Sequence, residues 1–153
     1  MYTREQTSLI KQQFWTAFGS YMSPVLSSEG EKVSWINYKT GIRHLSFKMN
    51  VSNFDAYIGI EMVHQYSDDP MKTYNRFLAL KTVLEQELQE TWTWEERVEI
   101  EGGKQISRIY TSLTPCNIFN KADWPPIISF LKPRLISLDS FWAEHKMIFE
   151  MLQ

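Results

Sequence analysis

The chain has 153 residues and a net charge of −2, which is the size of one domain and leaves no strong basic or acidic field. We therefore expect a single domain over residues 1–153. No apolar run approaches the roughly 20 residues that span a bilayer, and the N-terminus lacks the apolar segment of a signal peptide, so no membrane association is expected. Cys116 is the only cysteine, which excludes an internal disulfide and favours a cytoplasmic location.

The N-terminal segment predicts an amphipathic helix from about Arg4 to Phe18. Thr3 and Gln6 have the spacing of a capping box, in which each side chain bonds the backbone N–H of the other residue. Gly19 favours the end of the helix. Apolar residues recur every three or four positions, as on the buried face of a helix: Ile10, Phe14, Ala17, Phe18 and Tyr21.

A first strand is predicted over Val33–Tyr38, which is rich in β-branched and aromatic residues. The run 42–64 then alternates between apolar and polar residues, which is typical of half-buried strands. Apolar positions are odd before Ser52 and even after Asn53, so a two-residue turn at these residues predicts a hairpin and a three-stranded meander. Its apolar face comprises Leu45, Phe47, Met49, Val51, Phe54, Ala56, Ile58, Ile60 and Met62. In this register Leu45 faces Ile60.

Ser67–Pro70 predicts the start of a second helix, with an aspartate cap and a proline in the first turn, and the helix runs to about Glu90. A second hairpin follows, with strands over 92–100 and Ile106–Leu113 joined by a turn at 101–104. The inner stripe of the helix consists of Tyr74, Phe77, Leu78, Lys81, Leu84 and Leu88.

The last third of the chain is predicted to be helical, and Pro125 and Pro126 suit a first helical turn. Pro133 removes a backbone donor from the helix interior, so we expect a kink or two helices that meet near Lys132. An apolar seam either packs along the sheet or a neighbouring helix, or forms a coiled contact in a homodimer. The seam consists of Trp124, Ile128, Leu131, Leu135, Leu138, Trp142, His145, Phe149 and Leu152.

The order of elements predicts the α+β class. An antiparallel meander of about five strands is packed by an N-terminal helix, a central helix and a long or kinked C-terminal helix.

The polar face of the central hairpin is the candidate site. His44 opposite Glu61 has the arrangement of an acid–base pair, because a carboxylate raises the pKa of an imidazole and orients its ring. Gly59 beside them leaves space for a ligand. The alternatives are a cross-strand pair that only stabilises the sheet and a glycine that only lets a helix approach. The same face carries Ser46, Lys48 and Tyr57.

We expect no metal and no cofactor. His44, His64 and Cys116 lack the spacing of a zinc site, and Cys116 has no local motif that would activate a nucleophile. Gly102–Gly103 lacks the spacing of a phosphate-binding loop.

Aromatic and basic residues are interleaved at two places, a pattern found in proteins that stack single-stranded nucleic acid. They are Trp35, Tyr38, Lys39 and Arg43, then Arg97, Arg108 and Tyr110. Nucleic acid is nevertheless disfavoured, though it stays open, because the second hairpin also carries Glu95, Glu96, Glu99 and Glu101. The candidate binding residues are Lys48, Tyr57, Trp35, Tyr38 and Arg43.

Short motifs are scattered over nearly the whole chain: Phe14-Trp15, Trp35-Ile36-Asn37-Tyr38, Thr40-Gly41-Ile42, Ile60-Glu61, Tyr74 and Phe77 with Lys81, Trp94-Glu95, and Asp123-Trp124. In these motifs the chain resembles a bacterial family of domains of unknown function. Some members of that family follow nuclease-like domains, so the resemblance implies a DNA-related context for relatives.

The order of elements is also similar to the core of the restriction-endonuclease-like superfamily. That resemblance implies a Mg²⁺ site made of an acidic residue and an Asp/Glu-x-Lys motif on the next strand. Here Asp55 and Glu61 share one strand about 20 Å apart, and Val63 stands in place of the lysine. A fold of this type is therefore expected to be catalytically inactive.

We expect a binding or interaction domain that self-associates through its aromatic surface or its C-terminal helix, with a second copy or another protein as its partner. The alternatives are a degenerate nuclease-like domain and a small hydrolase that uses His44 and Glu61.

Overall fold

The computed structural model describes residues 2–64 and 69–152. Its four strands form one antiparallel sheet in the order β1-β2-β4-β3. The predicted α+β class is confirmed, with four strands in the described residues where about five were expected. In chain order the elements are α1 (Arg4–Met22), β1 (Leu45–Val51), β2 (Ala56–Val63), α2 (Pro70–Ala79), α3 (Lys81–Leu88), β3 (Thr93–Glu99), β4 (Gln105–Leu113), the 3₁₀ helix η2 (Lys121–Asp123) and α4 (Trp124–Glu150).

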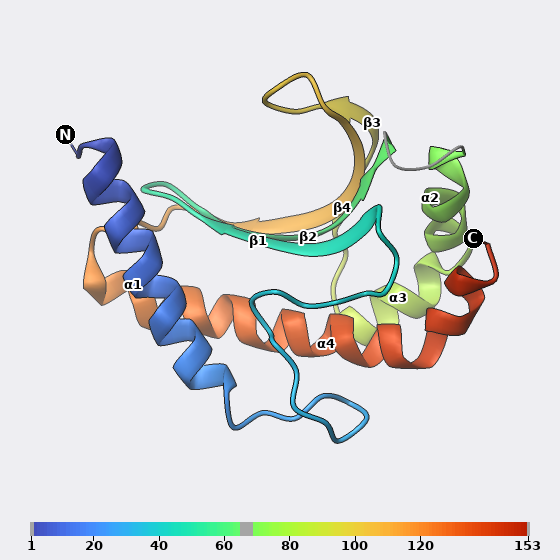
Figure 1. Ribbon diagram of the computed structural model, residues 1–153, viewed down its shortest axis with the longest axis horizontal. Coiled ribbons are helices and arrows are strands. Elements are labelled where there is room, and N and C mark those ends of the chain that lie inside the picture. Colours follow the sequence, from blue (N-terminus) through green and yellow to red (C-terminus); the bar gives the residue numbers. More distant parts are fainter. Residues whose placement is uncertain (1, 65–68, 153) are drawn as a thin grey trace.

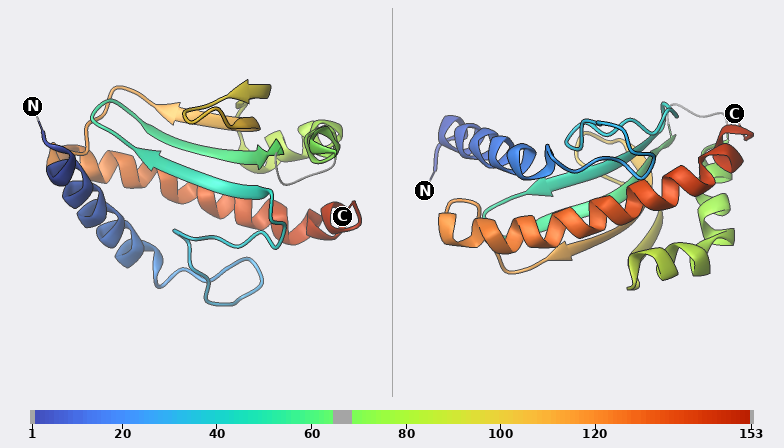
Figure 2. Two further views of the ribbon diagram at one scale, coloured as in Figure 1. Left: turned by 45° about the horizontal axis from the view of Figure 1, so that its top comes forward. Right: turned by 90° about the horizontal axis from the view of Figure 1, so that it is seen from below.

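The sheet is curved, and the long helix α4 runs along its convex face (Figure 1). α1 crosses near one end of α4, α2 and α3 pack at the other end, and the β3–β4 hairpin bends over the concave face (Figures 1 and 2). Aromatic rings fill the space between the sheet and α4. The Phe47 ring lies 5.9 Å from Trp142, and the Phe14 ring of α1 lies 5.4 Å from Trp124.

The central hairpin forms, but its turn is centred one residue later than predicted. The N–H of Ser52 donates to the carbonyl of Asp55 at 2.9 Å, and its hydroxyl oxygen accepts from the N–H of Asp55 at 2.9 Å. Leu45 therefore faces Met62 and not Ile60. Moving the turn by one residue changes the cross-strand partner of each residue by two positions. Because side chains alternate with a period of two, each residue stays on its predicted face of the sheet. The exception is Phe54, which lies in the turn and is exposed.

The strand predicted over Val33–Tyr38 is wrong, because this segment is a loop held by side chains. The Ser34 hydroxyl accepts from the N–H of Asn37 at 3.2 Å, and the Trp35 indole donates to the carbonyl of Val25 at 3.0 Å. The Ser34 bond is of the local kind that competes with a strand ladder. As a result, nothing in the described residues pairs with β1 as a strand on its outer side.

The helices also differ from prediction at their ends. The capping box of Thr3 and Gln6 is confirmed, but α1 continues past Gly19 to Met22, and Tyr21 is exposed. The predicted central helix divides at Leu80 into α2 and α3.

The buried stripe of α2 and α3 contains Tyr74, Phe77, Leu84 and Leu88, whereas Leu78 and Lys81 are exposed. Asp69 precedes α2 but its side chain forms no capping bond. Ser67 and Asp68, part of the predicted helix start, lie outside the described residues.

α4 is one helix that continues through Pro133, so the two-helix alternative is wrong. Pro133 and Ser129 are exposed, and the Ser129 carbonyl that loses its helical donor can bond water. The apolar seam packs inside the chain against the sheet: Ile128, Leu131, Leu135, Leu138, Trp142 and Phe149 are buried. These residues are therefore not available for a coiled contact between two copies of the chain.

Candidate functional site

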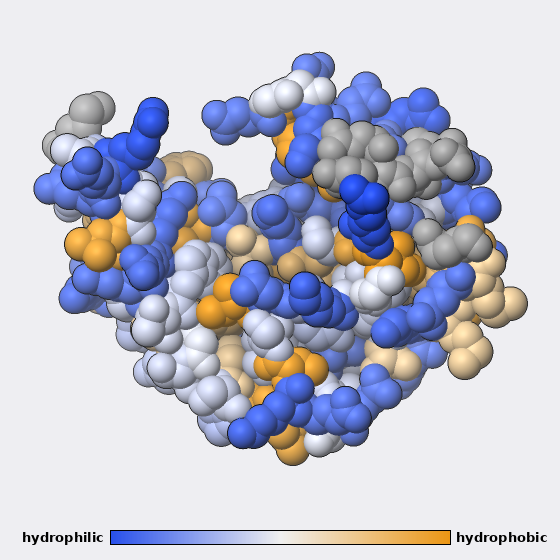
Figure 3. All heavy atoms as spheres, in the orientation of Figure 1, coloured by the Kyte–Doolittle hydropathy of each residue, from blue (hydrophilic) through white to orange (hydrophobic). Residues whose placement is uncertain are grey.

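The polar face of the hairpin lies on the concave side of the sheet, which forms an open hollow of about 600 Å³. The space-filling view shows the surface hollowed between the start of α1 and the β3–β4 hairpin (Figure 3). β1, β2 and β4 form the floor, and the β3–β4 turn forms one wall. Its polar lining includes Ser46, Lys48, Asn50, Asp55, Tyr57, Glu61, Glu101, Lys104 and Arg108.

Three side chains that line this hollow, Tyr57, Glu61 and Arg108, form a compensated network with two neighbours, Glu95 and Tyr110. The Tyr57 hydroxyl donates to Glu61 Oε2 at 2.7 Å, and Arg108 Nε donates to Glu95 Oε1 at 2.7 Å. The guanidinium of Arg108 lies 4.5 Å from the centre of the Tyr110 ring, which stacks on the Tyr57 ring at 5.3 Å. The basic side chains that line the hollow are equal in number to the acidic ones, and Arg108 is also paired with Glu95. The hollow therefore has no net positive field that would hold phosphate.

Gly59 has a structural role that neither sequence interpretation anticipated. A Cβ on Gly59 would lie 2.6 Å from the Tyr57 hydroxyl and 2.8 Å from Cβ of Tyr110. The absent side chain therefore makes room for the Tyr57 ring, which lies along its own strand toward Glu61. Burial, together with the charge of Glu61, raises the pKa of Tyr57, so the hydroxyl stays protonated and acts as a donor.

His44 and Glu61 are not brought together as an acid–base pair. His44 is buried and its Nε2 lies 2.8 Å from the Thr73 hydroxyl of α2, while Glu61 faces Ser46 across the strands. The prediction failed because the turn lies one residue later, which places Val63 opposite His44, and because Thr73 of α2 bonds the imidazole. Burial lowers the pKa of His44, which favours a neutral ring.

Cys116 and His64 also have structural partners. The Cys116 thiol is buried and donates to the Leu113 carbonyl at 3.5 Å, and burial raises its pKa, which disfavours the reactive thiolate. His64 Nε2 lies 2.8 Å from the Ser107 hydroxyl. Within residues 2–64 and 69–152, no three His, Cys, Asp or Glu side chains come together as a metal site.

β1 is an edge strand, and half of its backbone groups point away from the sheet. In an antiparallel pair, alternate residues exchange backbone hydrogen bonds with the partner strand. The N–H of Val63 donates to the carbonyl of His44 at 2.8 Å. The even-numbered residues of β1 therefore bond to β2, and Phe47 and Met49 direct their N–H and C=O groups outward.

Only the start of this free edge is covered. The N–H of Leu45 donates to the Ile42 carbonyl at 3.1 Å, and the Thr40 hydroxyl donates to the Leu45 carbonyl at 2.8 Å. In the part of the chain that the structure describes, no hydrogen bond occupies the backbone groups of Phe47 or Met49.

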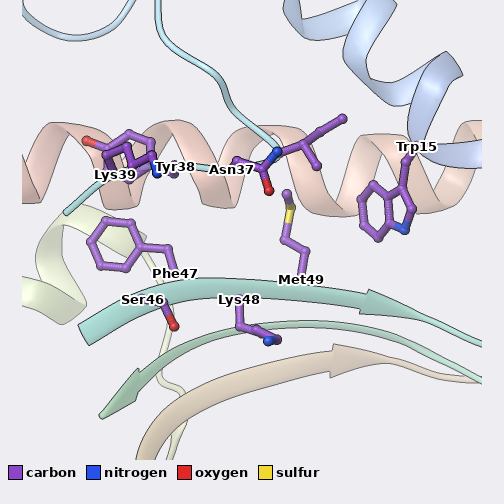
Figure 4. A pocket seen from close by; sticks show the side chains of 9 residues that line it. Trp15, Asn37, Tyr38, Lys39, Ser46, Phe47, Lys48 and Met49 are labelled. Carbon is purple, nitrogen blue, oxygen red and sulfur yellow. The ribbon is translucent and has the colours of Figure 1, made fainter. Parts of the chain in front are cut away.

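A groove of about 430 Å³ runs along the free edge of β1, and we call it the edge groove. Residues 46–49 of β1 form one side, and the loop 36–39 together with Trp15 of α1 forms the other. The close view shows Phe47 and Met49 pointing from β1 toward the loop, with Trp15 at one end (Figure 4). The two charged residues in its lining, Lys39 and Lys48, are both basic and exposed.

The loop wall is anchored to α4 by the buried carboxylate of Asp139. It accepts from the Tyr38 hydroxyl at 2.5 Å and from the N–H of Ser28 at 2.7 Å. Of the predicted binding residues, Lys48 lines both hollows, Tyr57 lines the concave one, and Tyr38 lines the edge groove. Trp35 is buried, and Arg43 is exposed just before β1.

The sequence interpretation missed the edge groove itself and the anchor Asp139, and it left Trp15 and Lys39 out of the candidate binding residues. A strand assigned to 33–38 would have covered β1 and hidden its edge. Lys48 in the middle of a strand was the available signal, because lysines often mark sheet edges.

None of the helices in the described residues combines the length and apolarity needed to cross a bilayer. No curated protein and no solved structure matches the chain. A family model described as a domain of unknown function, DUF4268, matches residues 10–146, which is most of the chain. The resemblance to a family of uncharacterised domains is therefore confirmed, and the chain belongs to the DUF4268 family.

Proposed function

We propose that this domain is a protein-interaction module that binds an extended segment of its partner along the free edge of β1. The observation that carries the proposal is the edge groove, in which the unpaired backbone groups of Phe47 and Met49 border an open cleft. An extended peptide that enters can add a strand to the sheet, with main-chain bonds for affinity and side-chain contacts for specificity.

The opposite edge of the sheet is less suited to this role. β3 has a register shift between Glu95 and Val98, and Arg97 has φ of 55°. A bulge interrupts the regular row of donors and acceptors that an added strand needs. β1 pairs with β2 without interruption from Leu45 to Val51, so its free edge keeps a regular spacing.

The alternatives have less support. The hydrolase hypothesis depends on His44 acting with Glu61. In the structure His44 bonds Thr73, and Glu61 bonds Tyr57. A nucleic-acid role would need net positive charge, yet the concave hollow is lined by as many acidic as basic side chains. The family match supports neither a nuclease-like neighbour nor self-association, and both stay predictions. Self-association through the C-terminal helix is disfavoured because its seam is buried.

A selection experiment tests the proposal without a known partner. Random twelve-residue peptides displayed on phage are selected on the immobilised domain, and enriched peptides are synthesised and titrated by fluorescence anisotropy. The test variant is Met49→Pro, which lacks the outward N–H and places a ring on the free edge. The control is Met49→Ala, which shortens the same side chain but keeps that N–H.

We expect saturable binding that Met49→Pro weakens by about tenfold or more, the equivalent of one main-chain hydrogen bond, beyond any loss caused by Met49→Ala. Enriched peptides that bind Met49→Pro and the wild type equally would overturn the proposal. Failure to enrich any saturable ligand would overturn it as well.

A further inference from the structure

We infer that the edge groove selects an extended segment with an acidic residue between two apolar residues, with the acidic side chain opposite Lys48. This inference rests on the proposed strand addition and specifies the chemistry of the partner. It follows from the pleat of β1 and from the charges that line the groove.

The pleat assigns each position of the added strand to a face. Residues paired across two antiparallel strands have their side chains on the same face. Ligand residues opposite Phe47 and Met49 would therefore project to the side where Phe47 and Met49 point, toward Trp15 and the loop 36–39 (Figure 4). That side offers the half-buried Trp15 and Met49 and the exposed Ile36, which favour apolar partners.

The ligand residue between these two would project to the concave face beside Lys48. Because the bonding groups of Phe47 and Met49 face the ligand, the residue opposite Lys48 occupies a non-hydrogen-bonded pair, in which the side chains approach most closely. A Glu or Asp at that position completes a cross-strand ion pair with Lys48. Lys39, in the loop wall, adds a second positive charge to the same groove.

The same geometry argues against a second copy of the chain as the occupant. Antiparallel pairing of two β1 strands about a twofold axis at their centre would place Lys48 opposite Lys48, and like charges directly opposite destabilise a ladder. The loop 36–39 and Trp15 also flank β1 in each copy, so two such edges could not approach without displacing both loops.

Two matched probes test the inference. One is a capped seven-residue peptide with a central Glu flanked by Ile on each side, and the other has Lys in place of the Glu. Each is titrated against the wild type and Lys48→Glu, and Lys81→Glu, at an exposed position of α3, serves as the control for total charge. Binding is measured by isothermal titration calorimetry, and hydrogen exchange follows the Phe47 and Met49 amides in the same complexes.

The wild type should bind the Glu peptide about fivefold to tenfold more tightly than the Lys peptide at low salt, with the difference shrinking as salt is raised. Lys48→Glu should reverse this preference, and Lys81→Glu should leave it intact. If both peptides protect the two amides and bind equally, the charge inference fails while strand addition stands. If neither peptide protects the amides, the proposed function fails with it. A mass by light scattering that doubles with concentration would instead assign the edge to a second copy.

Discussion

The orientation of the β1 backbone can be tested by proline substitution before any partner is known. Proline lacks the N–H group, so its cost in a strand depends on which way that group points. The hydrogen-bond alternation places the N–H of Lys48 on Gly59 of β2 and the N–H of Met49 on the free edge. Two adjacent residues should therefore respond in opposite ways.

Lys48→Pro removes a ladder bond and leaves the carbonyl of the buried Gly59 unpaired. An unsatisfied buried acceptor costs about 1–3 kcal/mol, and the proline ring adds crowding against the neighbouring strand, so we expect a loss of about 3 kcal/mol or more. Lys48→Ala, an exposed substitution, should change stability by less than about 0.5 kcal/mol.

Met49→Pro removes no bond within the sheet. Met49→Ala removes the same half-buried side chain, at a cost of about 1–2 kcal/mol in the free energy of unfolding. Met49→Pro should therefore cost less than about 1 kcal/mol more than Met49→Ala. Urea unfolding followed by tryptophan fluorescence gives all four free energies. At each position we compare the extra loss in the free energy of unfolding caused by proline relative to alanine. If this extra loss is as large at Met49 as at Lys48, or larger, the assigned edge is refuted.

Three further predictions follow from the contacts around the sheet and the loop. Gly59→Ala should cost about 1–3 kcal/mol in the same urea assay, because the new Cβ must displace the Tyr57 ring; an unchanged midpoint would contradict that contact. Asp139→Ala should cost about 3 kcal/mol, since it strips a buried acceptor from the Tyr38 hydroxyl and a backbone N–H, and a neutral result would show that the loop needs no anchor. Because burial lowers the pKa of His44, the unfolded chain binds more protons than the folded chain, so stability should decline as pH falls below about 6.5. His44→Gln should flatten that slope in melts between pH 7 and pH 5, and an identical slope would exclude His44 as its source.

Local patterns predicted the individual elements better than their pairing. Strict alternation of apolar and polar residues located β1 and β2 and their buried faces. One face of each strand is buried, so every second residue must be apolar. The turn was misplaced because the Ser52 N–H donates to the Asp55 carbonyl and the Ser52 hydroxyl accepts from the Asp55 N–H, which shifts the centre by one residue. That shift, together with the bond from His44 to Thr73 of α2, separates His44 from its expected partner.

The site was missed for a different reason. Val33–Tyr38 has the composition of a strand, yet Trp35 and Tyr38 bond to groups 10 and 101 residues away in sequence. Such distant contacts leave no periodic signature, so composition alone assigned a neighbour to β1 and concealed its edge. For Pro133 the local pattern predicted a break that does not occur. A helix tolerates an interior proline where the carbonyl that loses its donor is exposed to water, and the sequence pattern did not reveal that exposure.

Hydrogen exchange of individual backbone amides in β1 tests the central claim most directly. In the free domain, the amides of Ser46 and Lys48 should be protected by β2, whereas those of Phe47 and Met49 should exchange rapidly. A selected peptide at saturating concentration should slow exchange at Phe47 and Met49 and leave the even-numbered residues unchanged. Protection of Phe47 and Met49 in the free domain, or rapid exchange that persists in the complex, would contradict strand addition at this edge.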